Sequence, residues 1–309
     1  MTNIGETIHQ IRLSKGLTQQ EVYSGIISRS FASRFESGAN DIGASKLFAI
    51  LDNLAISADE LRFIHQNYQP SAYDQALWTI RHAYETLNFP ALATWIREHR
   101  HSPHAYEQLI ASYASILMLS YDHRSVGVTT TTQPAFDHLR QAKTWTLQEL
   151  KLVPVLIPII ASIDGLAALT PLTTHMAANC ASYQTGWGDP FHVSNDLLDF
   201  YGSLFQTKLN FHDFQSAQNL KTKFTAIDSH QLNWDGRLSQ QFWLGIWNLY
   251  FGDWQIGNQL LDEVSVLETH HHPGLIIRYL QFVTFALSKP RLIANRISLT
   301  SIFNTESLF

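Results

Sequence analysis

The stretch from residue 16 to residue 38, GLTQQEVYSGIISRSFASRFESG, predicts two short helices separated by a tight break. Thr18 can cap the first helix, with Glu21 three residues later as its capping-box partner. Ser28 can cap the second helix, which is expected to end at Gly38. This arrangement of caps, helices and break is that of a helix-turn-helix.

The second of these helices has two chemically different faces. Its apolar face carries Phe31, Ala32 and Phe35. Its polar face carries Ser30, Ser33 and Ser37, flanked by Arg29 and Arg34. A helix that buries aromatic rings on one side and offers hydroxyl and guanidinium groups on the other suits the major groove of DNA. The alternative is an ordinary amphipathic hairpin whose polar face meets only solvent.

Three further helices are expected around this pair. Isoleucines spaced three or four residues apart from Ile4 to Ile11 predict a preceding helix, which closes at Lys15 and Gly16. Ser45 is a candidate cap for a fourth helix, and a fifth helix begins at Ser57. Five short helices in the first 66 residues would form one compact domain around a single core.

Charge gives little electrostatic support to DNA binding. The chain has 309 residues, of which 45% are hydrophobic, so it is a folded protein and not a disordered one. Its formal net charge is −5, and residues 1–66 hold six Lys and Arg against seven Asp and Glu. If this domain binds DNA, its few basic side chains must therefore lie together on one of its faces. A single copy is expected to bind modestly, which favours a homodimer on two DNA half-sites.

The remaining sequence signals point to a cytoplasmic protein. The single cysteine, Cys180, excludes an intramolecular disulfide and suits a reducing compartment. No signal peptide precedes the expected first helix. The most apolar run, residues 152–169, is interrupted by Pro154, Pro158 and Asp164 and is not expected to span a membrane.

We expect neither a cofactor nor catalysis. The chain has no P-loop and no GxGxxG motif opening a helix. Asp189 and His192 have no nucleophile at the spacing of a catalytic triad. The three histidines 270–272 could bind a metal, but adjacent side chains in a loop seldom converge on one ion, and a solvated loop is favoured. The expected protein is therefore not an enzyme and holds no metal.

An internal repeat appears after residue 66. Residues 209–217 and 249–257 align at an offset of 40, and both copies share Asp-aromatic-Gln followed by a small residue. Residues 87–92, which begin Leu-Asn-Phe, form a weaker third copy. This period is typical of stacked helix pairs of the tetratricopeptide kind, because one pair cannot bury its apolar face alone. The alternative is an irregular helical domain with a chance similarity.

The sequence therefore predicts an all-α chain in three parts. Residues 1–66 form the helix-turn-helix DNA-binding domain, and residues 67–73, with Pro70, form a linker. Residues 74–309 form a helical repeat domain, an α-solenoid of roughly six helix pairs. We expect this second domain to dimerise and to regulate the first.

The N-terminal domain resembles the lambda-repressor-like, or XRE-type, DNA-binding domain. The order and spacing of the expected helices carry this likeness, together with two motifs. One is the Phe35-Glu36-x-Gly38 end of the second helix of the pair. The other is Leu54-x-Ile56-Ser57-x-Asp59-Glu60-Leu61. Tyr23 departs from the family, because many such domains carry a small alanine there, and helix packing around it must differ.

Over its whole length the chain resembles the Rgg/GadR/MutR regulators of Gram-positive bacteria. The likeness is strong over residues 1–66, where its motif residues lie between Ser28 and Asp52, and looser over the rest, where it includes Trp145-x-x-x-Glu149-Leu150 and Gly252-Asp253-Trp254. It implies a DNA-binding domain joined to helical repeats that dimerise and bind a short secreted peptide taken back into the cell, as in quorum sensing. Some members have a cysteine where this chain has Ala44, so no disulfide between two DNA-binding domains is expected there.

Seven residues are candidates for DNA contact. Gln19, Ser28 and Lys46 are placed to meet phosphates, Arg29, Ser30 and Ser33 to meet base edges, and Arg34 to meet either. Glu36 lies in the same helix but would repel DNA. We expect it to form an internal salt bridge, with Arg12 as its partner.

The candidate peptide site is less specific. Asn and Arg side chains could hold a peptide backbone, and aromatic rings could hold its apolar side chains. The candidates are Arg140, Asn179, Tyr183, Tyr201, Phe205, Trp247 and Asn248. Residues of these types are more often packing or surface residues than ligand contacts.

Two functions remain open at this point. The first is a peptide-responsive, dimeric transcription regulator. The second is a helical repeat scaffold for protein–protein interaction, with a secondary or inactive DNA-binding domain. The small number of basic groups on the second helix of the pair keeps the second possibility open.

Overall fold

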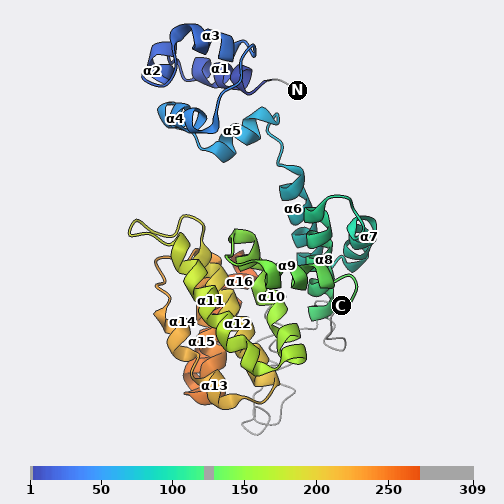
Figure 1. Ribbon diagram of the computed structural model, residues 1–309. Coiled ribbons are helices and arrows are strands. Elements are labelled where there is room, and N and C mark those ends of the chain that lie inside the picture. The colour runs from blue at the N-terminus through green and yellow to red at the C-terminus, as the bar shows by residue number, and fades with distance from the viewer. Residues whose placement is uncertain (1–2, 122–128, 272–309) are drawn as a thin grey trace. The chain divides into compact units, whose positions relative to one another are not determined.

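The computed structural model describes residues 3–121 and 129–271, and across these residues the chain is built from helices (Figure 1). The only extended pairing in the described part is a single bridge between Thr185 and Gly188. The expectation of an all-α chain is therefore confirmed. The chain divides into two compact units, an N-terminal unit of residues 1–78 and a C-terminal unit of residues 79–309.

The N-terminal unit holds the five expected short helices. They are α1 (Ile4–Ser14), α2 (Gln19–Tyr23), α3 (Arg29–Glu36), α4 (Ala44–Leu54) and α5 (Ala58–His65). The division between the two units falls inside α6 (Ala72–Glu85).

The C-terminal unit continues from α6. Its described elements are α7 (Phe89–His99), α8 (Ala105–Tyr121), α9 (Gln133–Gln141), α10 (Leu147–Asp164), the 3₁₀ turn η1 (Leu166–Ala168), α11 (Leu169–Tyr183), α12 (Val193–Asn210), α13 (Phe214–Gln218), α14 (Lys221–Ala226), α15 (Trp234–Phe251) and α16 (Trp254–His271). The last expected helix pair would fall largely in residues 272–309, outside the described residues.

Local capping chemistry sets most helix starts in the N-terminal unit. Thr18 accepts a hydrogen bond from the Glu21 N–H and completes the predicted capping box of α2. Ser28 caps α3 and Ser57 caps α5, both as predicted. The prediction for α4 was wrong by two residues, because its N-cap is Gly43 and not Ser45. No side chain accepts a capping hydrogen bond from the backbone N–H groups at this end of the helix.

One apolar core lies inside these five helices. It includes Ile8 of α1, Val22 of α2, Phe35 of α3 and Ile50 of α4, each fully shielded from solvent. Gly5 brings α1 against α3, because a Cβ atom added there would lie 1.8 Å from the carbonyl oxygen of Phe35. The position of α3 against α1 is therefore set by direct backbone contact as well as by side-chain burial.

The repeated Asp-aromatic-Gln motif marks the turn between two helices. Asp213 accepts a hydrogen bond from the Ser216 N–H at the start of α13. Asp253 accepts one from the Ile256 N–H at the start of α16. Asn88 does the same for the Ala91 N–H in α7. The structural repeat is thus one helix, a turn and a capped second helix.

This geometry corrects the register of the third copy. Leu87 has a positive φ of 54° directly before the cap Asn88, just as His212 has a φ of 61° directly before the cap Asp213. Leu87-Asn88-Phe89 therefore corresponds to residues 212–214 and not to Leu209-Asn-Phe, with which its letters align. The cap defines the equivalence, while the match of three letters is coincidental.

Close approaches between helices hold the C-terminal unit together. Figure 1 shows α10, α11, α12 and α15 side by side, and they pack against one another. A Cβ atom added to Gly202 of α12 would lie 2.3 Å from the Trp243 ring of α15, so only glycine allows this contact. Gly257 of α16 approaches the Gly245 carbonyl of α15 in the same way.

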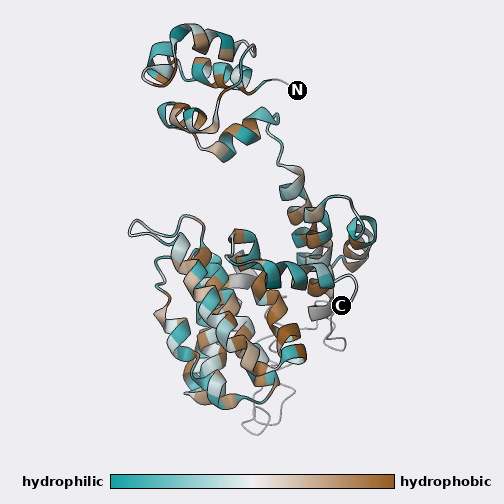
Figure 2. Cartoon of the chain, viewed as in Figure 1, coloured by the Kyte–Doolittle hydropathy of each residue, from teal (hydrophilic) through white to brown (hydrophobic). Residues whose placement is uncertain are grey.

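The most apolar run of the sequence falls largely in α10, where most of its side chains are buried and the helix packs against α12 (Figure 2). Its last residues, 165–169, continue through η1 to the start of α11. Pro154 and Pro158 lie inside this helix. Ser203 of α12 donates a 2.7 Å hydrogen bond to the Pro154 carbonyl and so joins the two helices. Of the helices in the described ranges, none is both long and apolar enough to cross a membrane.

Candidate functional site

Helix α3 presents the polar face that the sequence predicts. Phe35 and Ala32 are fully buried, whereas the three serines and two arginines of the opposite face are exposed. The Ser28 hydroxyl accepts a hydrogen bond from the Phe31 N–H at 3.3 Å and fixes the first turn. The polar face is therefore free to meet a partner.

Two predicted DNA-contact residues lie next to each other across α2 and α3. The Ser33 hydroxyl is 3.5 Å from the side-chain oxygen of Gln19, the first residue of α2. Ser28 and Ser30 form a second close pair, with their hydroxyl oxygens 3.3 Å apart. The structure thus brings predicted residues of α3 together with the start of α2.

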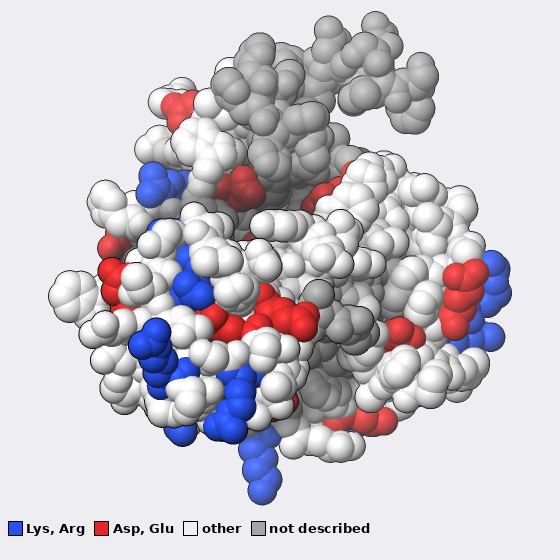
Figure 3. Space-filling model, turned by 90° about the horizontal axis from the view of Figure 1, so that it is seen from above, with Lys and Arg blue, Asp and Glu red and all other residues white. Residues whose placement is uncertain are grey.

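The three predicted basic contacts are exposed. Arg29 and Arg34 lie on α3, and Lys46 lies in the first turn of α4. Among the described residues none of the three has a carboxylate partner within ion-pair distance. On the face drawn in Figure 3, Lys and Arg are interspersed with Asp and Glu and do not merge into one basic surface.

Glu36, at the C-terminal end of α3, is the centre of a buried hydrogen-bond network. Its Oε1 accepts hydrogen bonds from Arg12 Nε at 2.6 Å and Tyr23 Oη at 2.7 Å. Its Oε2 accepts from Arg12 Nη2 at 2.8 Å and Gln19 Nε2 at 2.9 Å, and lies 2.7 Å from His9 Nδ1. The predicted Arg12–Glu36 salt bridge is confirmed.

The network keeps Glu36 ionised although only 6% of its surface is exposed. Burial alone would raise the pKa of this carboxyl, but the hydrogen bonds from Arg12, Gln19 and Tyr23 outweigh it and hold the pKa at about 2. In return, the carboxylate raises the pKa of the Arg12 guanidinium. The negative charge of Glu36 is therefore balanced by Arg12 inside the unit and is not presented on the polar face of α3.

Tyr23 explains how the unit accommodates a large residue where related domains carry a small one. Its ring is 2% exposed and packs edge-on against Phe35, with ring centroids 6.5 Å apart. Its hydroxyl reaches Glu36. Sequence reasoning missed Tyr23 and His9 as partners of Glu36, although a tyrosine at a predicted core position signals a buried polar partner.

Three of the seven predicted peptide contacts are core residues. Tyr201, Phe205 and Trp247 are buried among the apolar side chains of α10, α12 and α15. The Trp247 Nε1–H donates to the Gln218 carbonyl at 2.9 Å, so its polar atom is also occupied. These side chains cannot meet a ligand without opening the core.

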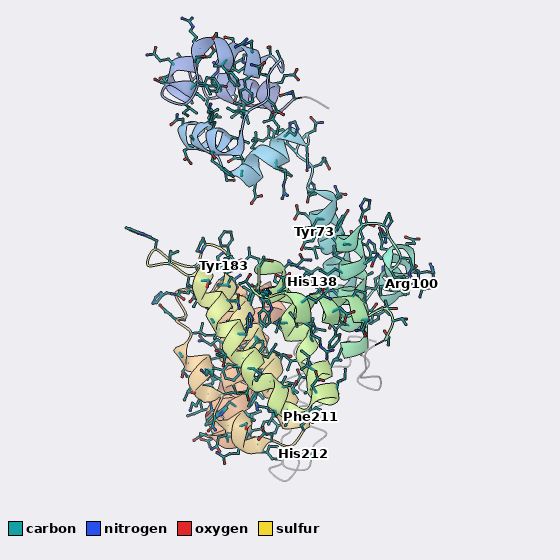
Figure 4. The ribbon with its side chains drawn as sticks, in the orientation of Figure 1. Tyr73, Arg100, His138, Tyr183, Phe211 and His212 are labelled. Carbon is teal, nitrogen blue, oxygen red and sulfur yellow. The ribbon has the colours of Figure 1, made fainter. Side chains whose placement is uncertain are left out.

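The other four predicted peptide contacts are accessible but dispersed. Arg140 is exposed and pairs with Asp164 at 3.2 Å. Asn179 accepts from the Trp145 backbone N–H at 2.9 Å. Tyr183, labelled at the end of α11 in Figure 4, is partly exposed, and Asn248 donates to the Leu244 carbonyl. The structure does not join them into one cluster.

Three buried polar atoms in the described part of the C-terminal unit lack a hydrogen-bond partner, the Thr207 hydroxyl and the two atoms described next. The Trp145 ring is 5% exposed and stacks on His175 with centroids 4.2 Å apart, yet its Nε1–H has no acceptor. Asp196 of α12 has an equally unpartnered Oδ2. Burial raises the pKa of Asp196 to about 7, which the positive charges of Lys151 and Arg81 only partly counter. Sequence reasoning singled out neither group as polar and buried.

The structure offers no centre for a metal ion within residues 3–121 and 129–271, where no three His, Cys, Asp or Glu side chains converge suitably. Histidines 270 and 271 end helix α16 and do not lie in the loop that the sequence suggested. The side chains of histidines 270–272 lie outside the described residues.

Comparison with known proteins supports two statements. The helix-turn-helix family matches residues 8–61, which contain α2, α3 and the Glu36 network. By contrast, no curated protein matches the chain by sequence. The N-terminal part of the chain is therefore a helix-turn-helix domain, as its geometry indicates.

Solved structures match the fold of the whole chain. A protein of Listeria monocytogenes EGD-e assigned to transcriptional regulators is 20% identical, with a TM-score of 0.69 over 93% of this chain and 99% of that one. The SHP pheromone receptor Rgg2 of Streptococcus dysgalactiae is 17% identical, with a TM-score of 0.67 over 92% and 98%. PrgX in complex with iCF10 is 13% identical, with a TM-score of 0.62 over 94% and 99%. The resemblance to Rgg regulators is thus confirmed at the level of fold.

Proposed function

We propose that this chain is a sequence-specific, DNA-binding transcription regulator whose helical repeat domain dimerises and senses a short signalling peptide. The observation that carries the proposal is the exposed polar face of α3, held in place by the buried Glu36 network. This face stands in a domain that matches the helix-turn-helix family. The protein is then not an enzyme, acts in the cytoplasm and needs no cofactor.

The positions of the predicted DNA contacts support two kinds of contact, one to base edges and one to phosphates. Arg29, Ser30 and Ser33 project from the polar face of α3 and would meet base edges in the major groove. Gln19 and Ser28 stand at the starts of α2 and α3, where backbone N–H groups point outward and would meet phosphates. Lys46 would meet a phosphate, and Arg34 either a phosphate or a base.

The low basic charge supports a dimer. We call α3 the recognition helix, because its polar face would enter the DNA groove. The helices proposed to face DNA, α2, α3 and α4, carry only three exposed basic side chains, those of Arg29, Arg34 and Lys46. Few phosphate contacts give weak, salt-sensitive binding, and two linked copies bind much more tightly than one. We place the DNA-binding domain in residues 1–66, the linker in 67–73 and the dimerising repeats in 74–309.

A peptide is the proposed signal because the chain shares the fold of proteins whose structures were solved as pheromone receptors. Of the sequence-predicted contacts, Arg140 is exposed and Asn179, Tyr183 and Asn248 are partly exposed, so these four remain in the proposal. Tyr201, Phe205 and Trp247 leave it, because their side chains form the core.

The test is DNA binding by the full chain, measured against salt concentration on the DNA upstream of its own gene. Replacing Arg29 and Arg34 together with alanine should weaken binding at least tenfold and reduce the slope of log affinity against log salt by about 1 to 2. Arg62→Ala is the matched control, because Arg62 is exposed in α5 and pairs with Asp59 and Asp74. Unchanged affinity and slope in the double variant would defeat the proposal.

One observation favours the second candidate, a scaffold for protein–protein interaction. The net charge of −5 and the mixed charges of Figure 3 suit a protein whose DNA contacts are secondary. If the DNA-binding domain is inactive, the full chain binds no duplex with a sequence preference; if it is secondary, any preference is weak. Selection from a random pool of duplexes therefore separates the two candidates.

A further inference from the structure

The hydrogen-bonding direction of the Gln19 side chain is fixed by its neighbour. Gln19 Nε2 lies 2.9 Å from Oε2 of Glu36. An ionised carboxylate only accepts hydrogen bonds, and with a pKa held at about 2 by its hydrogen bonds against the cost of burial, Glu36 is ionised at any physiological pH. The amide NH₂ must therefore face Glu36, and the amide oxygen must point away from it.

The Ser33 hydroxyl is a hydrogen-bond donor to this oxygen. The hydroxyl lies 3.5 Å from Gln19 Oε1 and 3.2 Å from the backbone carbonyl of Arg29. Both neighbours are acceptors only, so a hydrogen bond to either of them uses the single hydroxyl hydrogen of Ser33. The lone pairs of the same oxygen are then left for the outside, on the exposed polar face of α3.

We propose that Ser33 is a specificity-determining residue that acts only as a hydrogen-bond acceptor and reads an exocyclic amino group of a base. In the major groove this group is the N6 amine of adenine or the N4 amine of cytosine. A free serine accepts or donates and reads either kind of base edge. Here the Arg29 carbonyl and the Gln19 oxygen remove the donor. The inference rests on the proposed function, because it requires α3 to lie in the major groove.

The contrast with Arg29 sharpens the proposal. Arg29 stands four residues earlier on the same face and carries only donors, so it pairs with acceptors such as guanine N7 and O6. One face of α3 therefore offers a donor at its start and an acceptor one turn later. This pattern distinguishes a guanine from an adenine or cytosine at neighbouring positions of a half-site.

The experiment uses the full chain and the duplexes it selects from a random pool. In the tightest duplex, each adenine is replaced by purine and each cytosine by 2-pyrimidinone, which removes one exocyclic amine at a time. For the wild-type chain, removal at one position of each half-site should weaken binding about three- to tenfold. Ser33→Ala should bind more weakly overall and be indifferent to that same amine.

Ser37→Ala is the matched control, because Ser37 is exposed at the end of α3 and its hydroxyl donates to the Arg34 carbonyl. It should keep the wild-type sensitivity at every position. The inference is wrong if Ser33→Ala keeps the full amine pattern, or if it loses sensitivity to an acceptor, tested with 7-deazapurines. If the wild-type chain selects no duplex, the proposed function fails before this inference is reached.

Discussion

The Tyr23 hydroxyl donates a 2.7 Å hydrogen bond to Oε1 of Glu36, and this bond joins the last residue of α2 to the last residue of α3. The two helices of the helix-turn-helix are thus tied together at their C-terminal ends by one buried tyrosine. Gln19 ties the start of α2 to the same carboxylate. Both ends of α2 therefore depend on Glu36, which makes this residue the link between the recognition helix and its support.

Tyr23→Phe tests this link without leaving a large cavity. It removes one of the donors to a buried charge, and we expect the opening free energy of α3 to fall by about 1.5 to 3 kcal/mol. Hydrogen exchange of the α3 amides in the full chain measures this quantity. Tyr68→Phe is the control, because Tyr68 is 65% exposed, and it should change the same exchange rates little. Equal effects of the two variants would show that the hydroxyl of Tyr23 contributes nothing.

Glu36→Gln should give a pH-dependent loss of stability. Burial opposes the charge of Glu36, but its hydrogen bonds lower the pKa to about 2, against an ordinary value of 4.5. A carboxyl whose pKa is lowered by folding stabilises the protein above its unfolded pKa and loses this effect as the pH falls through the folded value. The variant should therefore be less stable by up to ~3 kcal/mol at neutral pH, with the gap closing between about pH 4.5 and 2.

The measurement compares hydrogen exchange protection of α3 in the wild-type chain and in Glu36→Gln over this range. Taking the difference removes the titration of the other carboxylates, which both proteins share. A gap that stays constant with pH would mean that the variant acts through shape and not through charge.

Much of the N-terminal unit was readable from sequence, because a helix cap is local chemistry. The side chains of Thr18, Ser28 and Ser57 accept hydrogen bonds from backbone N–H groups three residues later in the chain. A segment of four or five residues is therefore enough to predict each cap. The start of α4 was missed, because Ser45 has the right chemistry while Gly43 holds the cap conformation. The register of the repeat at Leu87 failed for a similar reason, since a positive φ leaves no certain mark in a non-glycine residue.

The candidate site was only partly readable. The Arg12–Glu36 pair could be inferred, because two opposite charges were expected inside one small domain. The bonds from Tyr23 and Gln19 to the same carboxylate depend on how α2 crosses α3, which periodicity does not specify. Phe205 is a similar case in the repeats. The periodicity of apolar residues indicates which face of a helix points inward, but it does not tell whether a residue on that face is buried in the core or accessible to a ligand. Phe205 is buried in the core.

Asp196→Asn should have the opposite pH dependence to Glu36→Gln. Burial raises the pKa of Asp196 to about 7, and its Oδ2 has no hydrogen-bond partner. An acid whose pKa is raised by folding favours the folded state below its unfolded pKa, and this contribution is lost as the pH rises through the folded value. The variant should match the wild type near pH 4 and exceed it by about 1 to 3 kcal/mol at pH 8.

Tryptophan fluorescence is the readout, because seven of the eight tryptophans lie in the C-terminal unit, where Asp196 also lies. Melting curves should show little or no stabilisation at pH 4, a partial one at pH 5 and the full one at pH 8. Asp235→Asn, in the first turn of α15, is the comparison variant. A stabilisation of Asp196→Asn that is equal at all three pH values would contradict the assignment of a raised pKa.

Phe205→Ala should act on folding and not only on a ligand. Phe205 is fully buried and packs edge-on against Phe224 and Trp243, with ring centroids 5.7 and 6.1 Å away. Its removal should lower the unfolding free energy of the C-terminal unit by about 3 to 5 kcal/mol. Arg140→Ala should cost less than ~0.5 kcal/mol, because Arg140 forms only an exposed ion pair. Urea unfolding followed by tryptophan fluorescence measures both. A small loss in Phe205→Ala would return this residue to the candidate ligand surface.

Gly5→Ala should disable DNA binding while leaving the repeats intact. A Cβ atom at Gly5 would lie 1.8 Å from the Phe35 carbonyl, so α1 and α3 must move apart, and the Arg12–Glu36 pair between them is disturbed. Hydrogen exchange protection of α3 and DNA affinity should both fall sharply, whereas the tryptophan melting curve should stay as in the wild type. Gly43→Ala is the matched control, since no atom lies within 4 Å of its added Cβ and its φ of −71° suits any residue. This control should cost less than ~1 kcal/mol. If Gly5→Ala behaved like Gly43→Ala, the close packing of α1 on α3 would not be what orients the recognition helix.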